Sequence, residues 1–260
     1  MDKPFQGKTA IVTGSGQGIG RGIAERLAAD GARVVLCSRT EADLNTVAEA
    51  IRATGGEARA IALDLREPAS AQALIDFALH EFGAIDLLVN NAGATKRGDL
   101  LELDEQTFQD GFALKLFGAA RITRTAWPHL KASHGSVIMI GGVGGWTPGA
   151  EFVCGGSVNA ALLAFTKSVA ELGIRDGVQV NLINPGTIRT DRFEVRRQRL
   201  IKAEGIAPEE ADAAFIKKLN VTRIGEPSDI AALVAFIAGP GGRLMHGSLV
   251  DMDAGATKGI

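Results

Sequence analysis

The segment from Lys8 to Ala29 reads KTAIVTGSGQGIGRGIAERLAA and decides the fold. Residues 8–12 predict a short buried strand, and residues 19–29 predict an amphipathic helix because Ile19, Ile23 and Leu27 share one face. The glycine-rich turn between them leaves bare backbone beside the unpaired N–H groups of a helix N-terminus. This strand–turn–helix arrangement favours a pyrophosphate-binding site, and the alternative is a tight turn that holds no ligand.

Strand-like and helical patterns alternate along the rest of the chain. Further strands are predicted at 33–37, 58–63, 85–89, 136–140, 178–183 and 248–252, and further helices at 44–51, 70–82, 104–131, 155–172 and 228–238. Strict alternation is typical of βαβ units with right-handed crossovers. We therefore predict an α/β fold, a single-domain doubly wound (Rossmann-type) parallel seven-stranded sheet with helices on both faces, spanning 1–260. Within it, the polar stretch 190–219 is predicted to be a helical, mobile lid over the substrate, and Arg192 to Arg199 a solvated helix face.

Composition narrows the class of protein. The 260 residues are 46% hydrophobic and 22% charged, which is typical of a folded globular chain. The formal net charge is −2, whereas nucleic-acid-binding domains are typically basic, so we expect no nucleic-acid partner. No apolar run approaches the ~20 residues that span a bilayer, so we expect no membrane partner. The start lacks the apolar core of a secretion signal, and two cysteines favour a reducing, cytoplasmic location. The four scattered histidines predict no metal site.

The end of the second strand is where a dinucleotide site would select its cofactor. Ser38-Arg39-Thr40 stands there in place of an acidic side chain. An arginine favours the 2′-phosphate of NADP(H) over NAD(H) through charge-assisted hydrogen bonds. The alternative is an ordinary solvated arginine.

Four ordered segments give the chain a resemblance to the short-chain dehydrogenases/reductases. They are TGSGQGIG at 13–20, DL at 64–65, NNAG at 90–93 and NPGTIRT at 184–190, which resemble that family's cofactor turn, adenine contact, sheet-stabilising motif and nicotinamide segment. With the end of the second strand, the resemblance implies a set of cofactor-binding residues: Gly14, Ser15, Gln17, Gly18, Ile19, Ser38, Arg39, Asp64, Leu65, Asn91, Ala92, Gly93, Pro185, Gly186, Ile188 and Thr190.

The family's catalytic positions hold other residues in this chain. The family uses an Asn, a Ser, a Tyr and a Lys, with the Tyr as general acid/base. Placed by resemblance, the Tyr position falls on Gly155, the Lys position on Asn159, the Ser position on Gly142 and the Asn position on Lys115. The chain contains no tyrosine at all. The resemblance therefore implies an atypical member without the usual four residues.

Lys115 and Asn159 are candidate catalytic residues because they look like the family's Lys and Asn exchanged between two helices. If both face one cleft, a partly desolvated Lys115 would have a lowered pKa and could donate a proton. The alternative is an unrelated lysine on a helix flank. Cys154 and Glu151, just before Gly155, are other possible acids, although a free cysteine is more often a small buried hydrophobe.

The resemblance implies an NADP(H)-dependent oxidoreductase that acts on a small carbonyl or alcohol substrate with a non-standard proton donor. The alternative is a catalytically inactive NADP(H)-binding sensor or partner subunit with the same fold. Family members commonly form tetramers through their two long helices, so the resemblance also implies a homotetramer or a dimer. Fold alone does not decide between the two functions.

Overall fold

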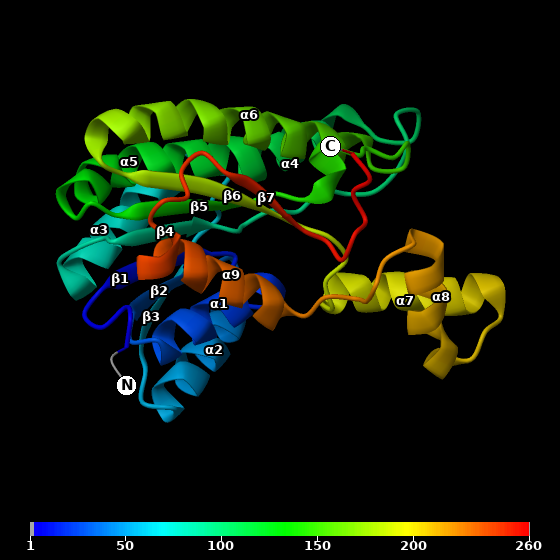
Figure 1. Cartoon of the computed structure of the whole chain (residues 1–260), viewed down its shortest axis with the longest axis horizontal. Helices are drawn as coiled ribbons and strands as arrows, with labels where there is room; N and C mark the ends of the chain where they lie inside the picture. Colours follow the sequence, from blue (N-terminus) through cyan, green and yellow to red (C-terminus); the bar gives the residue numbers. More distant parts are fainter. Residues whose placement is uncertain (1–2, 260) are drawn as a thin grey trace.

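Seven parallel strands form one twisted sheet in the order β3-β2-β1-β4-β5-β6-β7 (Figure 1). The computed structural model describes residues 3–259. The strands are β1 Thr9–Thr13, β2 Arg33–Ser38, β3 Glu57–Ala62, β4 Leu87–Asn90, β5 Ser136–Ile140, β6 Gln179–Pro185 and β7 Leu249–Met252. This confirms the predicted α/β, doubly wound parallel sheet, and the predicted strand ends agree with the observed ones to within two residues.

Helices cover both faces of the sheet, as Figure 1 shows. One face carries α1 Gly18–Ala29, α2 Glu41–Ala53 and α9 Pro227–Ala238, and the other carries α3 Ser70–Phe82, α5 Ala119–Ala132 and α6 Val153–Asp176. Each face has its own hydrophobic core, because successive side chains of a strand point to opposite sides. In β1, for example, Ala10 and Val12 join the α1 side and Ile11 joins the α6 side.

The predicted helix 104–131 is three segments instead of one regular helix. It consists of α4 Glu105–Phe112, the π-helix η1 Ala113–Gly118 and α5. The Asp104 carboxylate begins α4 by accepting the Thr107 N–H at 2.8 Å, as an N-cap does. Arg121 donates to the carbonyl oxygens of Leu65 and Arg66, at 3.1 and 2.9 Å, and holds the wide turn against the loop after β3. Single π-turns are frequent at functional sites.

The predicted lid consists of α7 Asp191–Glu204, the 3₁₀ turn η3 Pro208–Glu210 and α8 Ala211–Leu219. Figure 1 shows α7 and α8 standing apart from the layers around the sheet. They have a small core of their own, made of Phe193, Leu200, Phe215 and Ile224. The Phe193 and Phe215 rings pack with centroids 5.2 Å apart. The segment is therefore a separately packed unit over one end of the sheet.

Helix α6 is longer and more apolar than the sequence pattern predicts. Its 24 residues are long and apolar enough to cross a membrane by length and composition, whereas we expected no such run. Half of its apolar window is buried inside the protein. Its last residue, Asp176, accepts hydrogen bonds from Trp127 Nε1 and Lys131 Nζ of α5, both at 2.9 Å. The helix thus packs against α5 and the sheet as part of the folded domain.

Candidate active site

A crevice is expected where β1 and β4 lie side by side, because their connections leave the sheet in opposite directions. Thr13, at the end of β1, accepts the N–H groups of Asn91 and Ala92 through its hydroxyl, both at 3.0 Å. The Asn91 amide in turn donates to the carbonyl oxygens of Thr13 and Gly14, at 2.9 and 3.1 Å. Asn91 therefore fastens the loop after β4 to the glycine-rich turn.

The glycine-rich turn has the geometry of a phosphate cradle. Gly14 and Gly18 have left-handed backbone angles, with φ of 66° and 56°, which glycine adopts without a Cβ penalty. A Cβ at Gly20 would overlap the Gly14 carbonyl and the Asn91 amide. The Ser15 hydroxyl accepts the Cys37 N–H at 3.0 Å and so anchors the turn to β2. Bare backbone at the start of α1 fits the pyrophosphate of a dinucleotide.

The residues predicted to hold the adenosine end lie beside this turn. A Cβ at Gly16 would stand 3.1 Å from the Ser38 hydroxyl, so the end of β2 abuts the turn. Arg39 is exposed and, in residues 3–259, pairs with no carboxylate. The pKa of Asp64 is lowered mainly by the hydrogen bonds that it accepts from Arg66, and to a smaller extent by the positive charge of Arg39. An unpaired guanidinium here fits a 2′-phosphate.

The segment after β6 reaches the same crevice from the opposite side. Gly186 donates to the Met252 carbonyl at 3.1 Å, and Ile188 is buried in the core. A Cβ at Gly18 would lie 3.1 Å from the methyl group of Thr190. The two ends of the predicted cofactor site, separated in the sequence, thus meet across the crevice.

Lys115 extends from the π-turn into this region. Its Nζ donates to the carbonyl oxygen of Gly141 at 2.8 Å. Its aliphatic stem lies against Gly93, where a Cβ would be 2.9 Å from the lysine Cδ. Burial lowers the pKa of Lys115 to about 7, and the nearby charge of Arg192 acts in the same direction. An amine with this pKa can exchange a proton near neutral pH.

Asn159 lies against Gly142, the residue that follows Gly141. Its side chain is only 3% exposed, and a Cβ at Gly142 would stand 3.0 Å from its Nδ2. Its Oδ1 accepts no hydrogen bond from the described part of the chain. The Gly142 N–H donates to Asn184 Oδ1 at 3.0 Å. Lys115 and Asn159 therefore converge on Gly141–Gly142, and the missing side chain at Gly142 makes room for the amide.

Phe152 fills the space beside Gly155. A Cβ at Gly155 would overlap three atoms of the Phe152 ring, and a Cβ at Gly144 would lie 2.9 Å from the same ring. The Arg97 guanidinium stacks over the ring, 4.9 Å from its centroid. Phe152 is not among the residues predicted from the sequence, although an aromatic residue three positions before Gly155 is a signal that could have indicated it.

Most of Arg192 to Arg199 is exposed, as expected of a solvated helix face, but three of its arginines also make specific contacts. Arg192 donates to the Gly93 carbonyl oxygen at 2.6 Å. Arg196 stacks over Phe215, 5.3 Å from the ring centroid. Arg197 forms an ion pair with Asp212 at 3.1 Å. These contacts attach the lid to Gly93, in the loop after β4, and cover its own small core.

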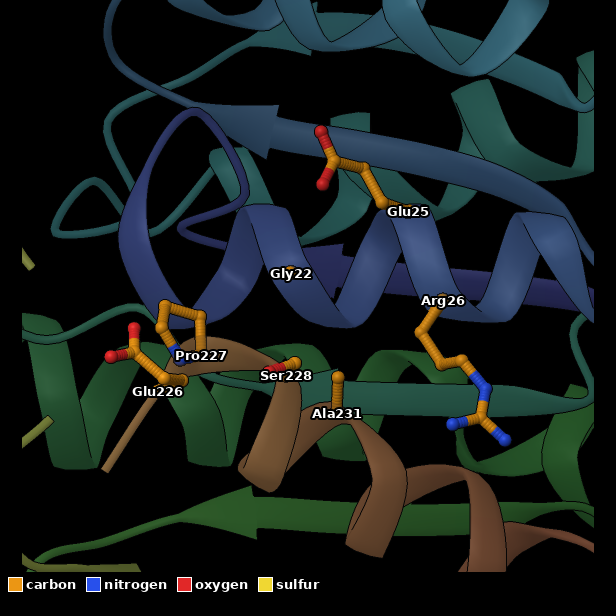
Figure 2. Close-up of a pocket in the computed structure, with 7 residues that line it drawn as sticks. All are labelled: Gly22, Glu25, Arg26, Glu226, Pro227, Ser228 and Ala231. Carbon is orange, nitrogen blue, oxygen red and sulfur yellow. The ribbon is translucent and has the colours of Figure 1, made fainter. Parts of the chain in front are cut away.

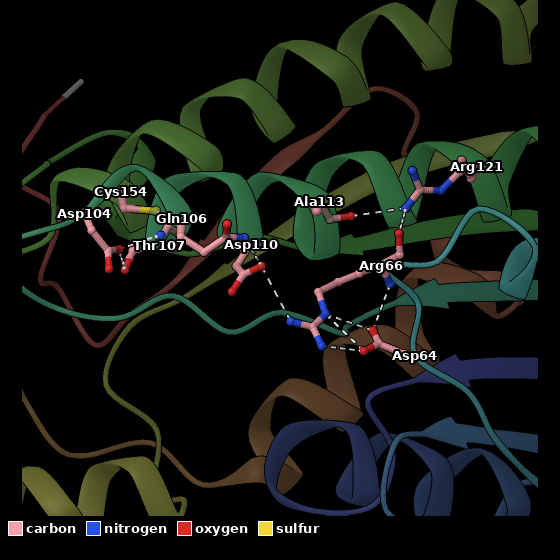
Figure 3. A network of polar contacts seen from close by, with 9 residues as sticks. All are labelled: Asp64, Arg66, Asp104, Gln106, Thr107, Asp110, Ala113, Arg121 and Cys154. Carbon is pink, nitrogen blue, oxygen red and sulfur yellow. Dashed lines mark hydrogen bonds and ion pairs between the residues drawn. The ribbon is translucent and has the colours of Figure 1, made fainter.

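The other candidate acids point elsewhere. Cys154 is fully buried, burial raises the pKa of its thiol, and its Sγ lies 3.6 Å from the Thr107 carbonyl oxygen of α4 (Figure 3). Glu151 is exposed, and its backbone carbonyl accepts the Gly98 N–H.

Figure 3 also shows Arg66 between Asp64 and Asp110, with its guanidinium 3.6 Å from the Asp110 carboxylate. Across residues 3–259, no group of three His, Cys, Asp or Glu side chains is placed to hold a metal ion.

A separate pocket of about 340 Å³ lies between α1 and α9 (Figure 2). It is lined by Gly22, Glu25, Arg26, Glu226, Pro227, Ser228 and Ala231. Two of its charged side chains are engaged along α1, since Glu25 pairs with Arg21 and Arg26 pairs with Asp30. None of its lining residues belongs to the predicted site.

Comparisons with known proteins agree with this geometry. A sequence model described as short chain dehydrogenase matches residues 8–200. An uncharacterised oxidoreductase of Mycobacterium tuberculosis is 36% identical over 96% of this chain and 92% of its own length. The 3-oxoacyl-[acyl-carrier-protein] reductase of Escherichia coli is 30% identical over 96% of this chain and 98% of its own. L-sorbose reductase of Gluconobacter frateurii, solved with NADPH and L-sorbose, superposes with a TM-score of 0.95 at 28% identity, covering 100% of both chains.

The doubly wound sheet, the glycine cradle at its switch point and the match over most of the sequence lead to one assignment. The chain belongs to the short-chain dehydrogenase family and is an oxidoreductase of that family by descent.

Proposed function

We propose that the protein is an NADP(H)-dependent reductase of small carbonyl compounds in which Lys115 donates the proton. The observation that carries the proposal is the Lys115 amine, whose pKa is about 7 and which is held 2.8 Å from the Gly141 carbonyl beside the nicotinamide segment. The solved relatives with NADPH or NADP support the choice of cofactor. A bound NADPH would supply the hydride.

Lys115 and Asn159 would act together on the substrate carbonyl. The Lys115 ammonium gives its proton to the carbonyl oxygen, and the neutral amine regains a proton from solvent. The Asn159 amide lies where a side chain at Gly142 would project, so its N–H group can orient the same oxygen. Glycine at 142 and at 155 would make this exchange of roles possible, which makes the chain an atypical family member.

The decisive experiment is a fluorescence titration with NADPH and NADH, followed by NADPH oxidation against a panel of ketones. Turnover well above background supports the reductase. Tight NADPH binding without hydride exchange on any substrate would instead favour the second candidate, an inactive NADP(H)-binding sensor or partner subunit. The observation in favour of that candidate is the Phe152 ring, which fills the space beside Gly155.

Arg39 is expected to select the phosphorylated cofactor. Replacing it with glutamate removes a charge-assisted partner of the 2′-phosphate and adds a repulsive charge. We expect NADPH affinity to fall about tenfold or more while NADH affinity holds or rises. Fluorescence titration with both cofactors measures the ratio. Arg124→Gln, at an exposed arginine of α5, is the control, and an unchanged ratio in the Arg39 variant would remove the assignment.

An oligomer remains our proposal for the assembled state. Two large apolar side chains are exposed in the two stretches predicted as long helices, Phe117 of η1 at 52% and Ile174 of α6 at 67%. Such residues support burial against another copy of the chain.

A further inference from the structure

Three arginines from two separate elements gather at the mouth of the candidate active site. Arg97 lies in the loop after β4 and stacks on Phe152, the ring that fills the space beside Gly155. Arg192 and Arg196 come from α7 of the lid. Arg196 follows Arg192 by four residues, so the two side chains lie on the same side of α7. Burial, and to a smaller extent the charge of Arg97, lowers the pKa of Arg196. Arg192 reaches Gly93, the residue against which Lys115 packs.

The arginines in and just before the lid differ in their partners. Arg189 and Arg197 both pair with Asp212, at 2.7 and 3.1 Å. Arg192 and Arg196 form no ion pair with any carboxylate of residues 3–259, and neither does Arg97. Like charges that converge without a counter-charge repel one another and destabilise the fold locally. The Asp212 carboxylate is thus engaged by Arg189 and Arg197, and the positive charges of Arg97, Arg192 and Arg196 remain available.

We propose that Arg97, Arg192 and Arg196 bind an oxyanion, a carboxylate or a phosphate, carried by the substrate a few bonds from its reacting carbonyl. Guanidinium groups bind such oxyanions with two parallel hydrogen bonds, and the partial burial of Arg196 strengthens them. The inference rests on the proposed function, since it names the class of its substrate: keto acids or phosphorylated carbonyl compounds.

The test compares a keto acid with its ester on protein saturated with the oxidised cofactor, NADP⁺, which has no hydride to give. Calorimetric titration with levulinate and with methyl levulinate, which differ in the negative charge and one methyl group, therefore measures binding without turnover. We expect the acid to bind wild type at least about tenfold more tightly than the ester. The Arg97→Gln/Arg196→Gln double variant should lose that preference and bind the ester unchanged. Lys202→Gln removes one positive charge from an exposed position of the same helix and should keep the preference.

Several other outcomes of this experiment would count against the anion site. Equal binding of acid and ester, or no binding of the acid at millimolar concentration, would overturn the proposal. So would a double variant that loses NADPH affinity with its acid preference intact, because the arginines would then serve the cofactor. Inorganic phosphate as a third probe separates a phosphorylated substrate from a carboxylate. If NADPH does not bind, or if the bound acid is never reduced, the proposed function fails. The anion site is then tested separately, by the binding of the acid and the ester to the protein without cofactor.

Discussion

Replacing Lys115 with methionine is expected to lower the rate of carbonyl reduction by about 10²–10⁴-fold, the usual contribution of a general acid. Methionine keeps the volume of the stem that packs on Gly93 but cannot donate a proton. NADPH affinity should be unchanged, because the glycine cradle and Arg39 do not involve this side chain. Single-turnover NADPH oxidation and a fluorescence titration measure the two quantities separately.

Two further variants sharpen this result. Lys115→Arg keeps the positive charge but holds its proton too tightly to release it near neutral pH, so it should be as slow as the methionine variant. Lys167→Met, at an exposed lysine of α6, should behave as wild type. Full activity in Lys115→Met would show that the proton comes from another group.

The pH profile of wild type should carry the same signature. With a pKa of about 7, Lys115 is protonated below pH 7 and neutral above it. Reduction, which needs the ammonium, should therefore slow as the pH rises past 7, and oxidation of an alcohol, which needs the free amine, should quicken. The free energy of unfolding should also depend on pH, because burial disfavours the charged form of Lys115 in the folded state. It should increase as the pH rises from 7 toward the usual lysine pKa of about 10.4. A rate profile that is flat across pH 7 would contradict the assignment.

Restoring a tyrosine at position 155 is expected to destabilise the protein and leave its activity unimproved. The Cβ of any residue at 155 would overlap the Phe152 ring, and overpacking of this kind typically costs about 1–3 kcal/mol. Gly155→Ala tests the Cβ alone. Alanine gains about 1 kcal/mol over glycine inside a helix, so a net loss of stability would show that the clash outweighs the gain.

A double-mutant cycle attributes the effect to Phe152. We expect Gly155→Ala to become neutral or stabilising in a Phe152→Ala background, because the overlapping ring is gone. Denaturant unfolding of the four proteins measures the coupling. Gly149→Ala is the matched control, since nothing lies within 4 Å of a Cβ there. A Gly155→Tyr variant that is as stable as wild type and more active would mean that Phe152 moves aside freely.

The sheet could be predicted from the sequence because each strand and turn is marked by residues that are close together in the chain. Alternating apolar residues at 10–12 and at 34–37 define two faces, and glycines at 14 and 18 mark backbone angles that few other residues adopt. The positions of Lys115 and Asn159 came from a resemblance in spacing, and the structure brings both to Gly141–Gly142.

What the sequence could not give depends on contacts between distant segments. No side-chain pattern distinguishes the π-turn at 113–118 from an α-helix, because both bury similar faces. The filling of the space beside Gly155 depends on the ring of a neighbouring residue, and Arg97 and Arg196 lie about a hundred positions apart in the chain. Arg192 looked like surface charge because its partner is a backbone carbonyl, which no sequence motif reports.

Because Lys115 lies in the π-turn, the side chain that reaches Gly141 depends on the number of residues in that turn. A π-turn holds about one more residue than an α-helical turn, which is roughly 100° of rotation about the axis. Deleting one codon within 113–118 would restore a uniform helix and swing a different side chain toward Gly141. The group presented there can therefore be exchanged without a single substitution, by a change in helical phase alone.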